Sequence, residues 1–232
     1  MKNVIAAGLF AAGLIPGVAV GDEHPVVVEL YTSQGCSSCP PADELLAQLA
    51  NRDDVIPLSL HVDYWDYIGW KDVFADPAYT ARQKAYARAA GHRTIYTPQM
   101  IVGGVDNVVG YKPMMLADFI DTHQETPEKV ELALSRVDGN AVIRAEAPEG
   151  GAGTMIVQLV RYLPSQTVEI ERGENAGKTI TYHNIVTDWR VVAQWDGMEP
   201  LWLEIPIEGP EPVVALVQAS GNGAILGAAR LR

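Results

Sequence analysis

The order of apolar and polar residues divides the chain into two parts. In the first part, apolar runs of strand length alternate with segments whose apolar residues recur every three or four positions, as on one face of a helix. These patterns predict strands at 26–31, 55–62, 99–102 and 105–111, and helices at 40–50, 76–90 and 113–123. The alternation of strands and helices predicts an α/β unit over residues 22–125.

The second part of the chain loses helical periodicity after residues 124–128. Short β-rich runs follow at 130–137, 141–147, 154–163, 167–172, 179–186, 189–195, 201–207 and 213–219. Glycine- and asparagine-rich turn sequences separate these runs, for example at 138–140, 150–153 and 221–223. Many short strands with turn signals between them predict an antiparallel β-sandwich-like domain over residues 126–232.

The segment between the first strand and the first helix contains both cysteines of the chain, Cys36 and Cys39. Pro40 and Pro41 follow them, in the first turn of the helix, where proline is tolerated. The apolar residues of this helix fall on one face: Ala42, Leu45, Leu46 and Leu49. A cysteine at a helix start faces the positive end of the helix dipole, which lowers the pKa of its thiol. A C-x-x-C motif in this position therefore predicts a reactive redox pair.

Two other interpretations of the cysteine pair remain open. The pair can form an inert structural disulfide, although so short a loop constrains the unfolded chain little. It can also bind a metal such as Cu(I), which prefers thiolate ligands. A metal site needs further ligands, and His61, His92 and His183 stand alone in the sequence rather than in a ligand motif.

Composition and charge narrow the class of protein. The 232 residues are 48% hydrophobic and 20% charged, which is typical of a globular protein with a buried core. The net charge of −12 argues against nucleic acid or an anionic membrane as a partner, because phosphate binding needs a basic patch. Residues 1–21 combine Lys2, an apolar stretch and small residues at 19–21, which predicts a signal peptide. No later stretch is long enough to span a bilayer. We therefore expect an exported protein, periplasmic or secreted.

Three motifs carry a resemblance to a known family: ELYTSQGCSSCPPAD at 29–43, HVDYWDYIGWKD at 61–72 and YTPQMIVGG at 96–104. The first half of the chain resembles the thioredoxin superfamily. More narrowly, the chain is similar to an uncharacterised family of exported bacterial proteins in which a thioredoxin-like domain precedes a β-rich domain. The similarity extends into RGENAGKTITYHNIV and AILGAARL in the second half.

The resemblance implies a role for four residues. Cys36 would be the exposed nucleophile and Cys39 the resolving thiol. Pro98 would be a cis-proline facing the disulfide, and Thr97 would offer its backbone to an extended substrate. The Ser-Ser pair between the cysteines departs from the dipeptides of well-studied oxidoreductases, so the direction of electron flow is not implied.

Glu29 is an acid within the otherwise apolar strand 26–31, seven residues before Cys36. Related folds place a buried acid on this strand as a proton relay for the resolving cysteine, and burial raises the pKa of such a group. We therefore expect Glu29 to serve as a relay. The alternatives are a solvent-facing strand residue and a buried acid that is hydrogen-bonded for structure.

Two charged or glycine-rich segments have simpler interpretations. Arg82, Lys84 and Arg88 are expected on the solvated face of helix 76–90. The segment 173–179 superficially resembles a phosphate loop, but it has one residue too few between its glycines and no helix follows. It is expected to be a turn between two strands rather than a nucleotide site.

The sequence thus predicts an exported thiol–disulfide oxidoreductase that acts on protein or small-molecule thiols and disulfides. No diffusible cofactor is required, because the cysteine pair carries the electrons. The β-rich part is expected to dock a partner or to shield the active face. The competing hypothesis is a binding protein, either a copper carrier or a module whose disulfide is only structural.

Overall fold

The computed structural model of the chain describes residues 24–149 and 151–232. The predicted signal peptide, residues 1–21, lies outside this part. The described helices are α1 (Pro40–Leu49), α2 (Pro77–Ala89) and α3 (Pro113–Gln124), with a short 3-10 turn, η1 (Asp66–Ile68). The described strands are β1 (Val26–Thr32), β2 (Val55–His61), β3 (Gln99–Val102), β4 (Asp106–Val109), β5 (Glu131–Val137), β6 (Asn140–Glu146), β7 (Met155–Ile170), β8 (Lys178–Trp195), β9 (Leu201–Pro206), β10 (Val213–Ala219) and β11 (Ile225–Leu231).

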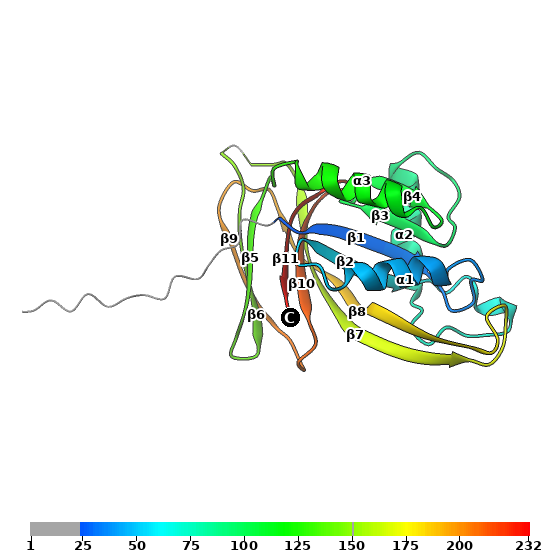
Figure 1. Cartoon of the computed structure of the whole chain (residues 1–232). Helices are drawn as coiled ribbons and strands as arrows, with labels where there is room; N and C mark the ends of the chain where they lie inside the picture. The colour runs from blue at the N-terminus through cyan, green and yellow to red at the C-terminus, as the bar shows by residue number, and fades with distance from the viewer. Residues whose placement is uncertain (1–23, 150) are drawn as a thin grey trace, which may run out of the picture.

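Eight of these strands form one sheet in the order β11-β10-β7-β8-β2-β1-β3-β4. Strand β1 pairs with β2 in parallel and with β3 antiparallel, and β4 is antiparallel to β3. Alternate side chains of a strand point to opposite faces. Accordingly Val28 and Leu30 pack with α1 and α3 on one face, whereas Val27 and Tyr31 pack with α2 on the other. Figure 1 shows α1 and α3 on the same side of the sheet.

The long hairpin β7–β8 joins the second half of the chain to the first. Strand β8 pairs with β2 in parallel at Ser59 and Ile185, and β10 and β11 extend the sheet beyond β7. The sheet therefore crosses the predicted domain boundary between residues 125 and 126. The turn end of the hairpin reaches past the start of α1 (Figure 1).

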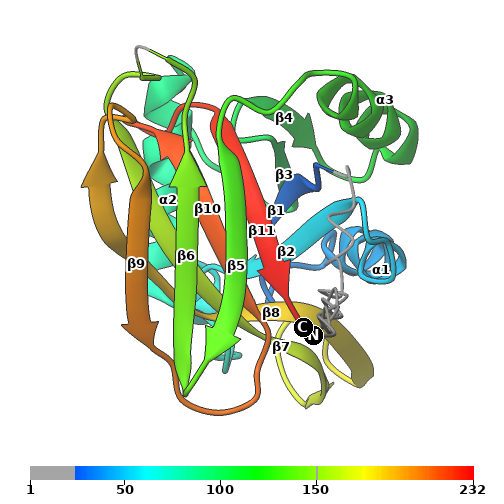
Figure 2. The same ribbon diagram turned by 90° about the vertical axis from the view of Figure 1, so that its left-hand side faces the viewer.

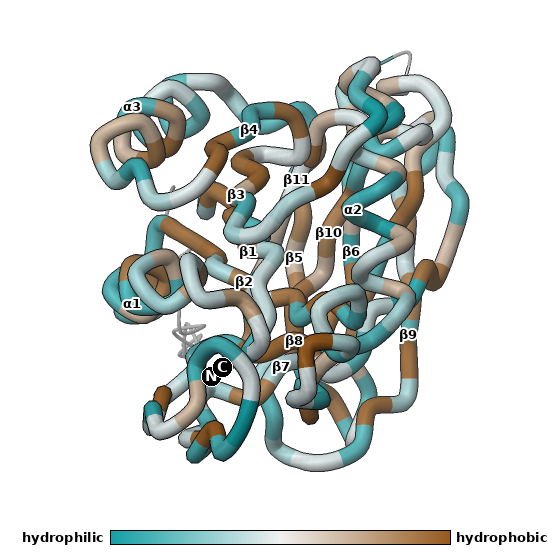
Figure 3. The backbone as a smooth tube through the Cα atoms, turned by 90° about the vertical axis from the view of Figure 1, so that its right-hand side faces the viewer, coloured by the Kyte–Doolittle hydropathy of each residue, from teal (hydrophilic) through white to brown (hydrophobic). Residues whose placement is uncertain are grey.

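The remaining three strands form a second sheet in the order β5-β6-β9. It covers the β7-β10-β11 end of the large sheet, as Figure 2 shows. Apolar side chains from both sheets meet between the layers, among them Ile143 of β6, Leu159 of β7 and Ala215 of β10. Figure 3 shows hydrophobic segments along strands inside the molecule, such as β10. The small sheet and the antiparallel β7-β10-β11 end of the large sheet thus bury these side chains between two layers.

Most predicted elements are present, with three differences. The runs 154–163 and 167–172 form one strand, β7, and the runs 179–186 and 189–195 form one strand, β8. Strand β11 was not predicted. The described architecture is a mixed, β-rich α/β fold. Within the described residues, no helix is both long and apolar enough to cross a bilayer.

Candidate functional site

The two cysteines form a disulfide between the end of β1 and the start of α1. Cys39 is the N-cap residue of α1, and Pro40 and Pro41 occupy the first turn as predicted. The Sγ of Cys36 lies 3.5 Å from the Oγ of Ser38, so this hydroxyl is placed to donate to the sulfur when Cys36 is a thiolate. The sulfur pair therefore sits at the positive end of the helix dipole.

The expectation that Cys36 is exposed is wrong for this structure. Only 1% of Cys36 is exposed to solvent, and Cys39 is fully buried. The loop around η1 lies against the residue before Cys36, since a Cβ on Gly35 would lie 3.2 Å from side-chain atoms of both Trp65 and Ile68. The absence of a side chain at Gly35 lets the two segments approach this closely. We call this loop, together with the turn of the β7–β8 hairpin, the cover.

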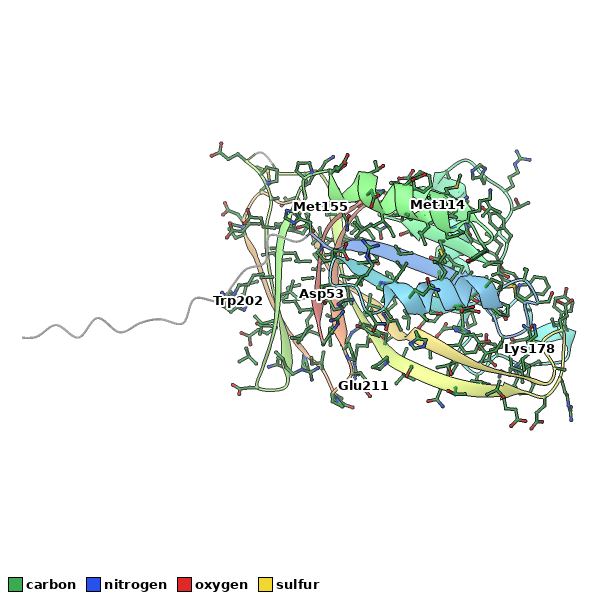
Figure 4. All side chains as sticks on the ribbon, in the orientation of Figure 1. Asp53, Met114, Met155, Lys178, Trp202 and Glu211 are labelled. Carbon is green, nitrogen blue, oxygen red and sulfur yellow. A yellow bond between two sulfur atoms is a disulfide. The ribbon has the colours of Figure 1, made fainter. Side chains whose placement is uncertain are left out.

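The turn of the β7–β8 hairpin completes the cover. The side-chain amide of Asn175 donates to the backbone carbonyls of Gln34 and Cys36, each at 2.9 Å. Lys178 donates to the Oδ1 of Asn175 at 2.8 Å, which fixes the orientation of the amide. Figure 4 shows Lys178 at the turn end of this hairpin. The segment 173–177 links β7 to β8 as a turn, as the sequence predicted.

Pro98 and Thr97 lie at the start of β3, beside the end of β1. The Thr97–Pro98 peptide bond is cis, as the resemblance implied. Strand pairing places Gln99 opposite Tyr31, which brings Pro98 next to the segment that leads to Cys36. The hydroxyl of Thr97 accepts a hydrogen bond of 2.7 Å from the indole nitrogen of Trp65. The cover residue Trp65 is thus tied to the residue before the proline.

Glu29 lies on the α2 face of the sheet, opposite the face that carries α1 and Cys39. Its Oε2 accepts from the Nε of Arg82 at 2.7 Å, and its Oε1 accepts from the Nη2 of Arg82 at 2.8 Å. The hydroxyls of Tyr31 and Tyr86 also donate to it, at 3.0 and 2.6 Å. This placement argues against a proton relay from Glu29 to Cys39. It favours the alternative of a buried acid that is hydrogen-bonded for structure.

Arg82 is not on the solvated face of α2, and that expectation is wrong. Its side chain is only 10% exposed and lies between the carboxylate of Glu29 and the ring of Trp189, with the guanidinium carbon 3.9 Å from the ring centroid. The fully buried charge of Glu29 requires an opposite charge nearby. Lys84 and Arg88 are exposed, as predicted.

A buried group of polar residues lies around the first turns of α1 and the carboxyl ends of β1 and β2. We call it the polar cluster, and its members are Thr32, Gln34, Asp43, Ser59, His61 and Asp72. The Nδ1 of His61 lies 2.7 Å from the Oδ2 of Asp72, and the same oxygen accepts from the backbone N–H of Gln34 at 2.8 Å. Asp72 therefore links His61 to the loop that leads to Cys36.

The polar cluster contains most of the unsatisfied polar atoms of the described residues. Of the seven buried side-chain nitrogen or oxygen atoms with no hydrogen-bond partner there, six belong to this cluster: Thr32 Oγ1, Gln34 Nε2, both carboxylate oxygens of Asp43, Ser59 Oγ and His61 Nε2. Unsatisfied buried polar atoms are costly, and a group of them calls for a functional explanation. Burial raises the pKa of Asp43 to about 7, while the nearby His61 and the hydroxyl of Thr32 act in the opposite direction.

The remaining histidines lie apart from the cysteines. His92 is exposed after α2, and His183 lies on β8 opposite Ser165. Across residues 24–149 and 151–232, histidine, cysteine and acidic side chains form no group of three or more that could hold a metal ion.

The protein thus has a β-rich α/β fold with a buried disulfide at the start of a helix. The chain belongs to the family of proteins of unknown function DUF1223, whose family model matches residues 27–218. A crystal structure of an Agrobacterium tumefaciens protein is 35% identical, with a TM-score of 0.78, over 91% of this chain and 96% of that chain. HBP35 of Porphyromonas gingivalis is 17% identical, with a TM-score of 0.64 over 90% of this chain and 75% of its own, and shares the fold alone. Among curated proteins, none matches the chain.

Proposed function

We propose that this protein is a thiol–disulfide oxidoreductase with a thioredoxin-like core. The observation that carries the proposal is the placement of its only two cysteines, disulfide-bonded across two residues, at the junction of β1 and the N-terminus of α1. The order β1-α1-β2-α2-β3-β4-α3 supports it, since a βαβ unit followed by a hairpin and a helix agrees with the resemblance to the thioredoxin superfamily.

The proposed reaction moves two electrons between a substrate and the cysteine pair. A substrate thiolate attacks Cys36, the Cys36–Cys39 bond breaks, and its electron pair goes to Cys39, which takes up a proton. A second substrate thiolate then attacks the substrate sulfur of the mixed disulfide, so that the substrate disulfide forms and Cys36 leaves as a thiolate. The reverse sequence reduces a substrate disulfide. An external thiol or disulfide returns the pair to its starting state.

Because both sulfurs are buried, the proposed exchange requires that the cover first opens. Asn175 and the side chains of Trp65 and Ile68 must separate from the segment 34–36 before a substrate sulfur approaches Cys36. The contact between Trp65 and Thr97 places the cover beside the residues that the resemblance assigns to substrate binding. A peptide that displaces the cover would thus arrive next to Thr97 and Pro98.

The proposed location is an oxidising compartment outside the cytoplasm, periplasmic or secreted. The signal-peptide pattern of residues 1–21 supports export. The disulfide between Cys36 and Cys39 is also consistent with such a compartment, because cytosolic thiols are kept reduced.

The burial of both sulfurs favours a second candidate function, a binding module in which the disulfide only fixes the start of α1. Thiol trapping of the protein in defined redox buffers separates the two. A reduction potential between about −120 and −270 mV, the range of known exchange catalysts, is expected for the oxidoreductase. A value below about −300 mV would indicate a stable structural disulfide and would support the binding module.

An exchange assay with matched variants completes this test. The wild-type protein is expected to catalyse exchange between a dithiol peptide and a disulfide peptide. Cys36→Ser is expected to abolish the activity, and Cys39→Ser to stop it at a mixed disulfide on Cys36 that can be isolated. Equal activity of both variants and the wild-type protein would contradict the proposal.

A further inference from the structure

We propose that Asp43 is the proton acceptor and donor for the sulfur of Cys39, and that His61 and Asp72 position the polar cluster for this transfer. The inference rests on the proposed oxidoreductase function and assigns the proton transfer of that same site. It replaces Glu29 by an acid that lies on the same face of the sheet as the cysteines.

Asp43 lies one helical turn after Cys39. The backbone N–H of Asp43 donates to the carbonyl of Cys39 at 3.1 Å, so the two residues are in helical register at positions i and i+4. Side chains with this spacing lie one above the other on the same face of a helix. Cys39 is fully buried and Asp43 is 4% exposed, so both point into the protein.

The sheet presents polar side chains to this face of α1. Thr32 on β1 pairs with His61 on β2, and Leu30 pairs with Ser59. Leu30 packs against α1, and residues of one strand that are two positions apart share a face. Thr32, Ser59 and His61 therefore point toward α1, where a sheet would ordinarily present apolar side chains.

The carboxylate of Asp43 is available for proton transfer. Neither of its oxygens has a partner at full hydrogen-bond geometry among the described residues, and the hydroxyl of Thr32 is its polar neighbour; Glu29, in contrast, accepts four hydrogen bonds. An acid that is held for structure would have its oxygens paired. Its unpaired state leaves lone pairs to accept a proton from a neighbouring thiol.

His61 and Asp72 are positioning residues in this proposal. His61 is held through Nδ1 by Asp72, and its Nε2 has no partner among the described residues. The other ionisable side chain near Asp43 is Tyr182 on β8, whose pKa burial raises, so that it stays neutral. The titratable groups that face Asp43 are thus His61 from β2, Asp72 from the segment after η1, and the neutral Tyr182 from β8.

The proton transfer balances in both directions. When the reduced protein resolves a mixed disulfide on Cys36, the Cys39 thiol gives its proton to the Asp43 carboxylate. The resulting thiolate attacks Cys36, the Cys36–Cys39 bond forms, and the substrate leaves as a thiolate. In the opposite direction, the protonated Asp43 returns the proton to Cys39 as the disulfide breaks.

The test follows the resolution step in the reduced protein with oxidised glutathione, by rapid thiol trapping between pH 5.5 and 9.5. Asp43→Asn is expected to slow resolution on the order of 100-fold at pH 7, as for the loss of a positioned base. The midpoint of the rate–pH profile is expected near pH 7 in the wild-type protein and at about 8.5 or above in Asp43→Asn, where a free thiol ionises. The first step, attack by Cys36, should change little and serves as an internal control.

Glu44→Gln is the matched control, because Glu44 is the next residue of α1 and is exposed. It is expected to keep the wild-type profile. If Asp43→Asn also keeps that profile while the wild-type protein exchanges normally, the role of Asp43 is disproved and the oxidoreductase function stands. If the wild-type protein forms no mixed disulfide, the oxidoreductase function itself fails.

A measurement on the wild-type protein covers the case in which Asp43→Asn does not fold. The carboxyl carbon of Asp43 can be followed by NMR as the pH is changed, in the oxidised and the reduced protein. We expect its titration to shift when the disulfide is reduced, because two groups that share a proton titrate as a pair. An identical titration in both states would overturn the proposal.

Discussion

Asn175, at the turn of the β7–β8 hairpin, donates its side-chain amide to the backbone carbonyl of Cys36, a residue 139 positions earlier in the chain. A second bond runs from the same amide to the carbonyl of Gln34. One side chain of the second half of the chain thus ties the hairpin to the disulfide loop. The turn of the hairpin is thereby held against the segment that contains Cys36.

The first prediction concerns this cover. Asn175→Ala removes both hydrogen bonds from the hairpin to the disulfide loop, each worth about 1 kcal/mol, so the covered state loses about 2 kcal/mol. Opening should therefore be roughly 10- to 30-fold more frequent, and reduction of the disulfide by a small dithiol should accelerate by a similar factor. The measurement is the rate of thiol appearance with excess dithiol. Glu174→Ala, at the exposed neighbouring position, should reduce at the wild-type rate. Equal rates for both variants would show that reduction does not pass through opening of this turn.

The second prediction concerns the buried ion pair of Glu29 and Arg82. Arg82→Met leaves the fully buried carboxylate of Glu29 without its opposite charge, which should lower the free energy of unfolding by about 3–5 kcal/mol. The measurement is urea unfolding at pH 7. Arg88→Met, on the exposed side of the same helix, should change the free energy by no more than about 0.5 kcal/mol.

The double variant with Glu29→Gln and Arg82→Met adds a specific check. It should be more stable than Arg82→Met alone, since no charge is left buried. Glu29→Gln by itself should destabilise the protein yet leave the pH profile of exchange in place. A slowed exchange with an unchanged fold would instead restore Glu29 as the relay.

Local patterns were sufficient to predict the elements that frame the site. The apolar run before Cys36, the two prolines and the apolar face of α1 predicted the strand–disulfide–helix junction. Helix α2 lies within the predicted range 76–90, and β10 has the predicted bounds. These signals depend on residues close in the sequence, which is why they can be interpreted without a structure.

Other features depend on contacts that the sequence does not display. Pro164 interrupts the apolar run in the sequence, so two strands were predicted where β7 is continuous. Beyond Arg161, β7 no longer pairs with β10, and proline is tolerated at such a free edge. Strand β11 contains Gly227, which is poor for a strand; a Cβ there would lie 2.5 Å from the carbonyl oxygen of Val130. The contacts of Asn175 and Asp43 form only in the folded chain, between elements that are distant in the sequence. The one local hint for Asp43 was its spacing of four from Cys39.

The third prediction concerns the division of the chain at residue 125. One buried cluster combines residues of both halves: Val27, Ile56, Leu58, Tyr79, Val160, Val214 and Leu216. A fragment ending at residue 125 would expose this apolar surface and the edge of β2 that pairs with β8. We expect the fragment to aggregate or to lack a cooperative unfolding transition, whereas the whole protein unfolds in one transition. A soluble fragment with a cooperative transition would show that residues 22–125 fold independently.

The last prediction concerns the pH dependence of stability. Burial raises the pKa of Asp43 to about 7, whereas an aspartate in the unfolded chain has a pKa of about 3.9. Between these values the folded protein binds more protons at this position than the unfolded chain, so its contribution to stability falls as the pH rises and levels off above pH 7. A shift of about three pH units corresponds to about 4 kcal/mol.

Asp43→Asn removes this titration while keeping the size of the side chain. The free energy of unfolding of the variant, relative to that of the wild-type protein, should therefore increase as the pH rises. The increase between pH 4 and pH 8 should be up to about 4 kcal/mol. Urea unfolding of the oxidised proteins at both pH values measures this difference, and Glu44→Gln should show little change. A difference that stays constant with pH would mean that Asp43 has the same pKa in the folded and the unfolded protein. Asp43 would then be ionised near neutral pH and unable to share a proton with Cys39 there.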